Sequence, residues 1–278
     1  MNQARITEEA CKKIERWEVK RRKSGREQPF VGTKDTWRVG RRHRRIDPKT
    51  KAHLVEASDL ERRAIRLLRH KFSDVTIKTQ VPLLPLEATI QIANELGVLH
   101  PRIWQENSAN TMSTDIVMNG FDRTTGEEHN IAVFVRYMKD LYNVVNGERR
   151  PITREWQKIE IAKIFEERVN NREYIILTDE QLSKNVEYSI NWLNVGKHKN
   201  FKADELIQFT KVFLDVYAEY EFEILEDLLI STADRSIRSF QECLSLFRFC
   251  GAKSYLPLEL EHRITLSSTI KMDVNNAV

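Results

Sequence analysis

The chain has 278 residues, which is enough for two domains, and its 41% hydrophobic and 31% charged residues are typical of a folded globular protein. No stretch approaches the roughly 20 apolar residues that a membrane-spanning helix requires, and the charged start of the chain does not have the pattern of a signal peptide. Three separated cysteines without a Cys-x-x-Cys pair argue against a disulfide framework and against a structural zinc site.

Positive charge is concentrated at the start of the chain. The net charge is +4, but residues 1–60 hold 17 Lys and Arg against 9 Asp and Glu, a surplus of 8. Such clusters suit a phosphate backbone, because each contact releases condensed counterions. A solvated basic segment without a ligand is the alternative. The predicted DNA-binding side chains are Lys20, Arg21, Arg22, Lys23, Arg41, Arg42, Arg44, Arg45, Lys49 and Lys51.

The first two thirds of the chain predict a mixed α/β arrangement. Residues 7–24 are expected to form a helix with Thr7 as its N-cap, and a loop-rich basic arm with short strands follows over 25–56. Ser58-Asp59-Leu60-Glu61 has the form of a capping box at the start of the next helix. The remaining expected elements are strands at 75–81, 114–118, 130–137 and 174–178, and helices at 86–96, 153–169 and 180–193. The polar turn at 119–128 is expected to join the second and third of these strands as a hairpin. Helices that flank a small sheet define an α/β class.

A polar, basic segment at 194–202 is the expected linker, so we predict one domain over 1–193 and a smaller one over 194–278. In the second domain, helices are expected over 203–230 and 236–250. Two later segments, 254–258 and 263–267, could pair as a β-wing. This outline is winged-helix-like and mainly helical.

An acidic pair is the main candidate for chemistry. Glu61 opens a helix and Asp115 opens a strand, and metal-dependent phosphodiesterases need two or more carboxylates to hold Mg²⁺ against a phosphate. Phe134 and Arg136 lie two apart on the following strand and therefore point to the same face of the sheet. Taken singly, Glu61 could be only the capping-box residue, and Asp115 could be an exposed residue at a strand start.

Several short motifs occur in a characteristic order along the chain. They are His43-Arg44-Arg45, Pro48-Lys49-Thr50-Lys51, Ser58-Asp59-Leu60-Glu61, Val81-Pro82-Leu83-Leu84-Pro85, His100-Pro101, Met112-Ser113-Thr114-Asp115, Thr178-Asp179 and Asn191-Trp192-Leu193. In this order and at these separations, over most of the chain, the sequence resembles TnsA, the endonuclease subunit of heteromeric transposases.

The resemblance implies a restriction-endonuclease-like domain over 1–193 and a winged-helix-like domain for partner and DNA contacts over 194–278. It implies that Mg²⁺ or Mn²⁺ is bound by Glu61, Asp115 and the Val135 backbone carbonyl. The family's Gln-Val-Lys motif falls on Phe134-Val135-Arg136, which keeps only the middle residue and leaves Arg136 as the cationic catalytic group.

The function implied is cleavage of the non-transferred (5′) strand at transposon ends during cut-and-paste transposition. The implied partners are double-stranded DNA, a TnsB-like DDE transposase and a TnsC-like ATPase regulator, in the bacterial cytoplasm and without a membrane. The alternative is a TnsA-like subunit that binds end DNA and supports both partners without cleaving. A nuclease of DNA repair or defence is a third interpretation.

Overall fold

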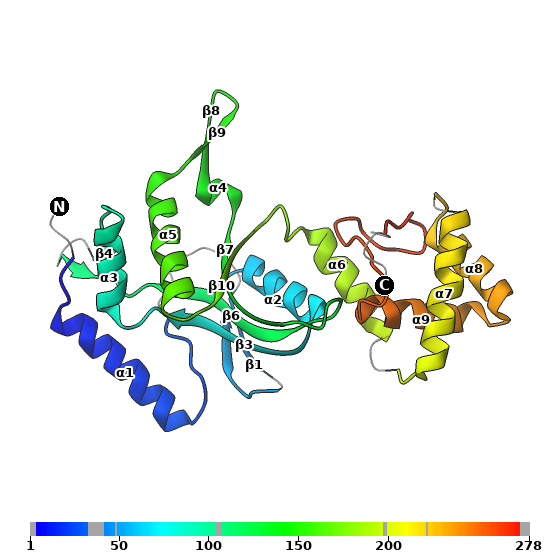
Figure 1. Cartoon of the computed structure of the whole chain (residues 1–278), viewed down its shortest axis with the longest axis horizontal. Helices are drawn as coiled ribbons and strands as arrows, with labels where there is room; N and C mark the ends of the chain where they lie inside the picture. The colour runs from blue at the N-terminus through cyan, green and yellow to red at the C-terminus, as the bar shows by residue number, and fades with distance from the viewer. Residues whose placement is uncertain are drawn as a thin grey trace. The chain divides into compact units, whose positions relative to one another are not determined.

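The computed structural model describes residues 4–32, 42–47, 49–103, 107–196, 199–220 and 222–272. The chain divides into two compact units, which we describe separately (Figure 1). Unit 1 comprises Met1–Ile65, Asp74–Phe121 and Glu127–Glu180, and unit 2 comprises Arg66–Ser73, Asp122–Gly126 and Gln181–Val278. Among the described helices, none is long and apolar enough to span a membrane.

The described part of the chain contains both helices and strands. The helices are α1 (Glu8–Ser24), α2 (Asp59–Lys71), α3 (Leu86–Glu95), α4 (Met138–Leu141), α5 (Thr153–Arg168), α6 (Lys184–Leu193), the 3₁₀ helix η1 (Asn194–Gly196), α7 (Ala203–Glu219), α8 (Leu225–Ser236) and α9 (Phe240–Ala252). The strands are β1 (His43–Ile46), β2 (His53–Glu56), β3 (Phe72–Pro82), β4 (Arg102–Ile103), β5 (Ser108–Ala109), β6 (Ser113–Asp122), β7 (Glu128–Arg136), β8 (Tyr142–Val145), β9 (Glu148–Pro151) and β10 (Glu173–Thr178).

A four-stranded sheet with the order β10-β7-β6-β3 carries the candidate site. β6 and β7 form an antiparallel hairpin in which Ile116 faces Val133, whereas β10 runs parallel to β7 with Ile176 beside Phe134. The stretch 131–135 of β7 is buried throughout, as expected for a strand with a neighbour on each side. The mixed sheet with its flanking helices confirms the predicted α/β class, and the predicted hairpin is confirmed with it.

Local sequence signals placed the ends of several helices correctly. The Thr7 side chain accepts a hydrogen bond from the Ala10 amide at the start of α1, and Gly25 ends this helix in the left-handed conformation that glycine adopts at low cost. Ser58 accepts from the Glu61 amide at the start of α2. The basic arm contains short strands, as predicted, and two of them, β1 and β2, pair as an antiparallel hairpin.

Helices α3 and α5 share one apolar cluster in unit 1. Ile92 and Ala93 of α3 pack with Ile161 and Phe165 of α5. The sequence did not predict the segment between β7 and α5, where α4 leads into an exposed hairpin of β8 and β9 that stands away from the rest of the unit (Figure 1). This hairpin is short and solvated, so no apolar alternation marks it.

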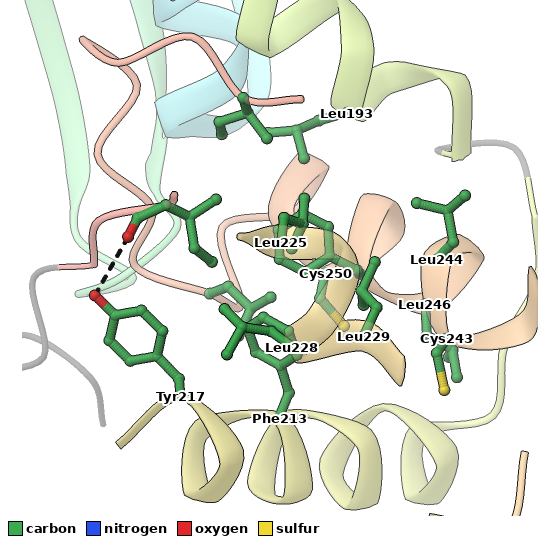
Figure 2. Close-up of a cluster of buried hydrophobic side chains, with 14 of the residues drawn as sticks. Leu193, Phe213, Tyr217, Leu225, Leu228, Leu229, Cys243, Leu244, Leu246 and Cys250 are labelled. Atoms are coloured by element: carbon green, nitrogen blue, oxygen red, sulfur yellow. Dashed lines mark hydrogen bonds between the residues drawn. The ribbon is translucent and has the colours of Figure 1, made fainter. Parts of the chain in front are cut away.

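The core of unit 2 is formed by α6, α7, α8 and α9 with the segment that follows α9. Phe213 of α7 projects toward Leu228 of α8, and Tyr217, one turn further along α7, belongs to the same buried cluster (Figure 2). The Tyr217 hydroxyl donates a hydrogen bond to the backbone carbonyl of Ile270, over 3.5 Å. The unit includes α6, whereas the sequence predicted a boundary after this helix: Val186, Ile190 and Leu193 bury their side chains in the core of unit 2.

Two predictions for the second half were wrong. The single helix expected over 203–230 is two helices, because the amides of Leu225 and Glu226 bond to the carbonyls of Ser268 and Leu266 instead of continuing α7. The expected wing does not form, because the described residues of 254–258 and 263–267 do not pair with one another. The bridges are instead Leu258 with Met272 and Ile224 with Thr269, so the winged-helix detail is not confirmed.

Candidate functional site

Glu61 lies in the first turn of α2, with its side chain turned back toward the preceding loop. Its Oε2 accepts a hydrogen bond of 2.9 Å from the Ala57 amide, and the residue is 4% exposed. The Ser58 hydroxyl caps the helix, but the Glu61 carboxylate does not return to the Ser58 amide as a complete capping box would. Helix capping therefore does not account for this carboxylate by itself.

Asp115 lies near the start of β6, where its neighbour β7 determines its contacts. Asp115 Oδ2 accepts hydrogen bonds from the Val135 amide at 2.9 Å and from Arg136 Nη1 at 2.8 Å. Arg136 Nη1 also donates to the Val135 carbonyl oxygen at 2.7 Å. Two of the predicted metal ligands, Asp115 and the Val135 carbonyl, thus converge on one point, and the guanidinium of Arg136 lies at that point. The interpretation of Asp115 as an exposed strand-start residue is wrong, because it is buried.

Gln80 joins the two carboxylates, and the sequence analysis missed it. It lies on β3, beside β6, and its Nε2 donates to Glu61 Oε2 and to Asp115 Oδ1, over 3.4 Å in each case. Its Oε1 accepts from the Ser113 hydroxyl at 3.3 Å, and its backbone has a positive φ of 51°. The available signal was a polar residue just before Val81 in a strand; its burial depends on tertiary packing.

The two carboxylates influence each other because both are buried. The pKa of Glu61 is raised to about 8, first by burial and then by the negative charge of Asp115. The Ala57 amide, Arg136 and Gln80 act in the opposite direction. A cation placed between the two carboxylates would favour the ionised form of Glu61.

Phe134 and Arg136 lie on the same face of β7, as predicted. The Arg136 guanidinium carbon lies 3.8 Å from the centre of the Phe134 ring, a cation–π contact. Phe134 belongs to an apolar cluster with Leu141 and Ile159, and it stacks on the ring of Tyr174. The Tyr174 hydroxyl is buried and has no hydrogen-bond partner among the described residues, and burial raises the pKa of this phenol. Phe134, which stands where TnsA has the glutamine of its motif, is therefore an apolar residue that supports the Arg136 side chain.

The donor set fits a hard divalent cation in its chemistry. Glu61, Asp115 and the Val135 carbonyl offer oxygen atoms, which Mg²⁺ prefers, and Mg²⁺ commonly keeps several waters. Among the described residues no group of three or more His, Cys, Asp or Glu is arranged to hold a metal. A metal at this site would therefore depend on two carboxylates, neutral oxygens and water.

The predicted DNA-binding residues fall on two separate elements, α1 and the β1–β2 hairpin with its loop. Several of them form ion pairs between described residues, including Arg21 with Glu27, Arg22 with Glu18, Arg45 with Glu56 and Lys49 with Asp74. Lys20 and Lys23 on α1 and Arg44 on β1 are exposed, as is Lys51, and Arg42 is half-buried. Arg41 lies outside the described residues. Closeness in sequence therefore overstated how many of these cations are available together.

Comparison with known proteins returned no matching protein-family model. A curated relative, the transposon Tn7 transposition protein TnsA of Escherichia coli, is 29% identical over 185 residues. The match covers 66% of this chain and 61% of the relative, so the chain spans about three fifths of the relative's length. This finding confirms the similarity that the motifs and their order predicted. The chain is accordingly similar to TnsA over about two thirds of its length.

Proposed function

We propose that this chain is a TnsA-like transposase subunit and that the site around Glu61 and Asp115 is a metal-dependent endonuclease site. One observation carries the proposal. The buried carboxylates of Glu61 and Asp115, from α2 and β6, both accept a hydrogen bond from the side-chain amide of Gln80 on β3. Asp115 and the Val135 carbonyl also both accept hydrogen bonds from the guanidinium of Arg136. Buried carboxylates are costly unless a cation or a proton compensates them, so this arrangement favours a functional site.

The roles of the residues follow from their contacts. Glu61, Asp115 and the Val135 carbonyl would hold Mg²⁺ or Mn²⁺, which when bound polarises a phosphodiester and provides an activated water. The Val135 amide orients Asp115. Arg136 stabilises negative charge on the phosphate electrostatically and does not act as a base, because a guanidinium keeps its proton at physiological pH.

The proposed substrate is the non-transferred (5′) strand at transposon ends, cut in the bacterial cytoplasm. Its proposed partners are a TnsB-like DDE transposase and a TnsC-like ATPase regulator, with unit 2 as the part that contacts them. The relative's printed name supports transposition as the process. The mixed sheet that carries Asp115, together with helix α2 that carries Glu61, is consistent with a nuclease fold.

The bonds of Arg136 favour a second candidate function. Its guanidinium already satisfies Asp115 Oδ2 and the Val135 carbonyl, and the side chain two residues before it is Phe134, which cannot bind a metal. A subunit of this kind would bind end DNA and support the transposase and its regulator without cutting. Transposition would then leave the non-transferred strand uncut and produce cointegrates.

Transposition with the partner proteins separates the two functions, scored as simple insertions against cointegrates. An active site predicts simple insertions for the wild type and cointegrates for Glu61→Gln. The matched control is Glu87→Gln, which removes an exposed carboxylate from the first turn of α3. If Glu61→Gln still gives simple insertions, the proposed active site is wrong. If the wild type gives only cointegrates and Arg136→Lys restores simple insertions, the chain is the non-cutting subunit and Arg136 is the cause.

A further inference from the structure

A basic groove lies along one face of α1, in unit 1. Its volume is about 490 Å³. Lys13, Arg16 and Lys20 line one wall from successive turns of the helix. The opposite wall is formed by Ser108 to Thr111 with Ile103, and Pro29, Phe30 and Gly32 also line the groove. Glu9, Ala10 and Trp17 of α1 complete the lining, so three cations face one carboxylate.

The three cations share one face because they lie three and four residues apart. All three are exposed, and within the described part of the chain none of them forms an ion pair. Lys13 lies over the Phe30 ring, with its Nζ 5.1 Å from the ring centre, a cation–π contact between two residues that line the groove. Three other cations of α1 form ion pairs: Lys12 pairs with Glu8, Arg21 with Glu27 and Arg22 with Glu18. Lys23 is exposed and continues the same face three residues after Lys20, beyond the groove lining. The cations of α1 that remain available to bind a ligand therefore lie along one face of the helix, and they are not simply the consecutive residues 20–23.

The far wall of the groove leads to the candidate site. Ser108 and Ala109 form β5, and the chain then passes through Thr111 into β6, which carries Asp115. Hydrogen bonds hold the start of α1 against this wall. The Thr7 hydroxyl is bonded to the Ser108 hydroxyl at 2.6 Å, and the Ala109 amide donates to the Arg5 carbonyl. Asn110 adds an exposed side-chain amide, which suits a phosphate contact, whereas Ser108 and Thr111 are buried in the wall.

We propose that this groove binds the phosphate backbone of duplex DNA through Lys13, Arg16 and Lys20. From Lys13 to Lys20 the helix rises by about 10 Å at roughly 1.5 Å per residue. One strand of B-DNA presents a phosphate about every 3.4 Å of helix axis, so the stripe matches about three consecutive phosphates. The contacts are to the backbone, so they position the duplex without reading its sequence. The inference rests on the proposed function only in taking DNA as the ligand.

The test is the salt dependence of DNA binding by the full chain, measured by fluorescence anisotropy on a duplex of arbitrary sequence. The triple variant Lys13→Gln/Arg16→Gln/Lys20→Gln is compared with Lys12→Gln/Arg21→Gln/Arg22→Gln, which removes the same charge from the paired positions. Each phosphate contact contributes about 0.9 to the slope of log affinity against log salt. The groove variant should reduce the slope by about two to three, and the control by less than one. Circular dichroism and melting curves verify that both variants fold.

Each other outcome overturns the proposal in a recognisable way. Equal reductions in both variants would mean that net charge alone matters, and an unchanged slope in the groove variant would remove the groove while leaving the nuclease proposal intact. If the wild type binds no duplex, the groove and the proposed function fail together. If the groove variant loses binding to polyglutamate but keeps its DNA slope, the groove is a site for an acidic protein segment.

Discussion

Replacing Arg136 by methionine tests the arrangement of the candidate site most directly. Methionine keeps a long side chain over Phe134 but removes the charge that faces Asp115. The Arg136 and Asp115 side chains are 15% and 7% exposed and 2.8 Å apart, so this is a largely buried pair. Removing one partner of such a pair costs about 3–5 kcal/mol, because the other charge is left uncompensated. In EDTA we expect Arg136→Met to lower the free energy of unfolding by about this amount.

Added Mg²⁺ should then distinguish the variant from the wild type. With the guanidinium gone, Asp115 and the Val135 carbonyl are open to a divalent cation, and a ligand at 100 times its dissociation constant stabilises the folded state by about 2.7 kcal/mol. The assay is urea denaturation followed by circular dichroism, in EDTA and in a Mg²⁺ series. We expect the stability of Arg136→Met to depend more steeply on Mg²⁺ than that of the wild type.

The matched control is Arg149→Met, which breaks an exposed pair. Arg149 and Glu180 are 57% and 53% exposed, and such pairs contribute about 0–1 kcal/mol. The reasoning is refuted if Arg136→Met unfolds within 1 kcal/mol of the wild type in EDTA, since the pair would then not compensate a buried charge. A Mg²⁺ response identical to that of the wild type would show that Arg136 does not compete with a metal.

Three further predictions concern pH and packing. Because the pKa of Glu61 is raised to about 8, the folded state prefers the protonated acid, and in EDTA the stability of the wild type should fall as pH rises from about 4.5 to 8. Urea denaturation of Glu61→Gln should give a flatter dependence of stability on pH, and parallel curves for the two proteins would contradict this. Burial lowers the pKa of His70 to about 4, so the folded state prefers the neutral ring and stability should be lost as pH falls from about 6.5 to 4. Acid denaturation of His70→Gln should lack this loss of stability, and an unchanged acid midpoint would show that His70 does not cause it. Phe213→Ala removes a fully buried ring from the core of unit 2 and should cost about 3–5 kcal/mol in urea denaturation, whereas a loss below 1 kcal/mol would mean that the core around it collapses to fill the space.

Local signals in the sequence were sufficient where a short stretch determines its own structure. Thr7 and Gly25 bound α1 because a cap depends on the few residues next to it. The β6–β7 hairpin followed from two apolar runs separated by a polar turn. Signals of this kind failed at Tyr220, where the periodicity runs on but the chain turns to pair with a segment more than 40 residues later.

The sequence by itself determined the α/β class, the acidic pair Glu61 and Asp115, the basic character of the first 60 residues and the resemblance to TnsA. Only the tertiary structure decided which groups meet. Gln80 and Arg136 reach the carboxylates because β3 and β7 lie on either side of β6, and strand order is not encoded in any local pattern. In the same way, the ion pairs of α1 left its available cations on a single face, because neighbours in sequence project to different sides of a helix.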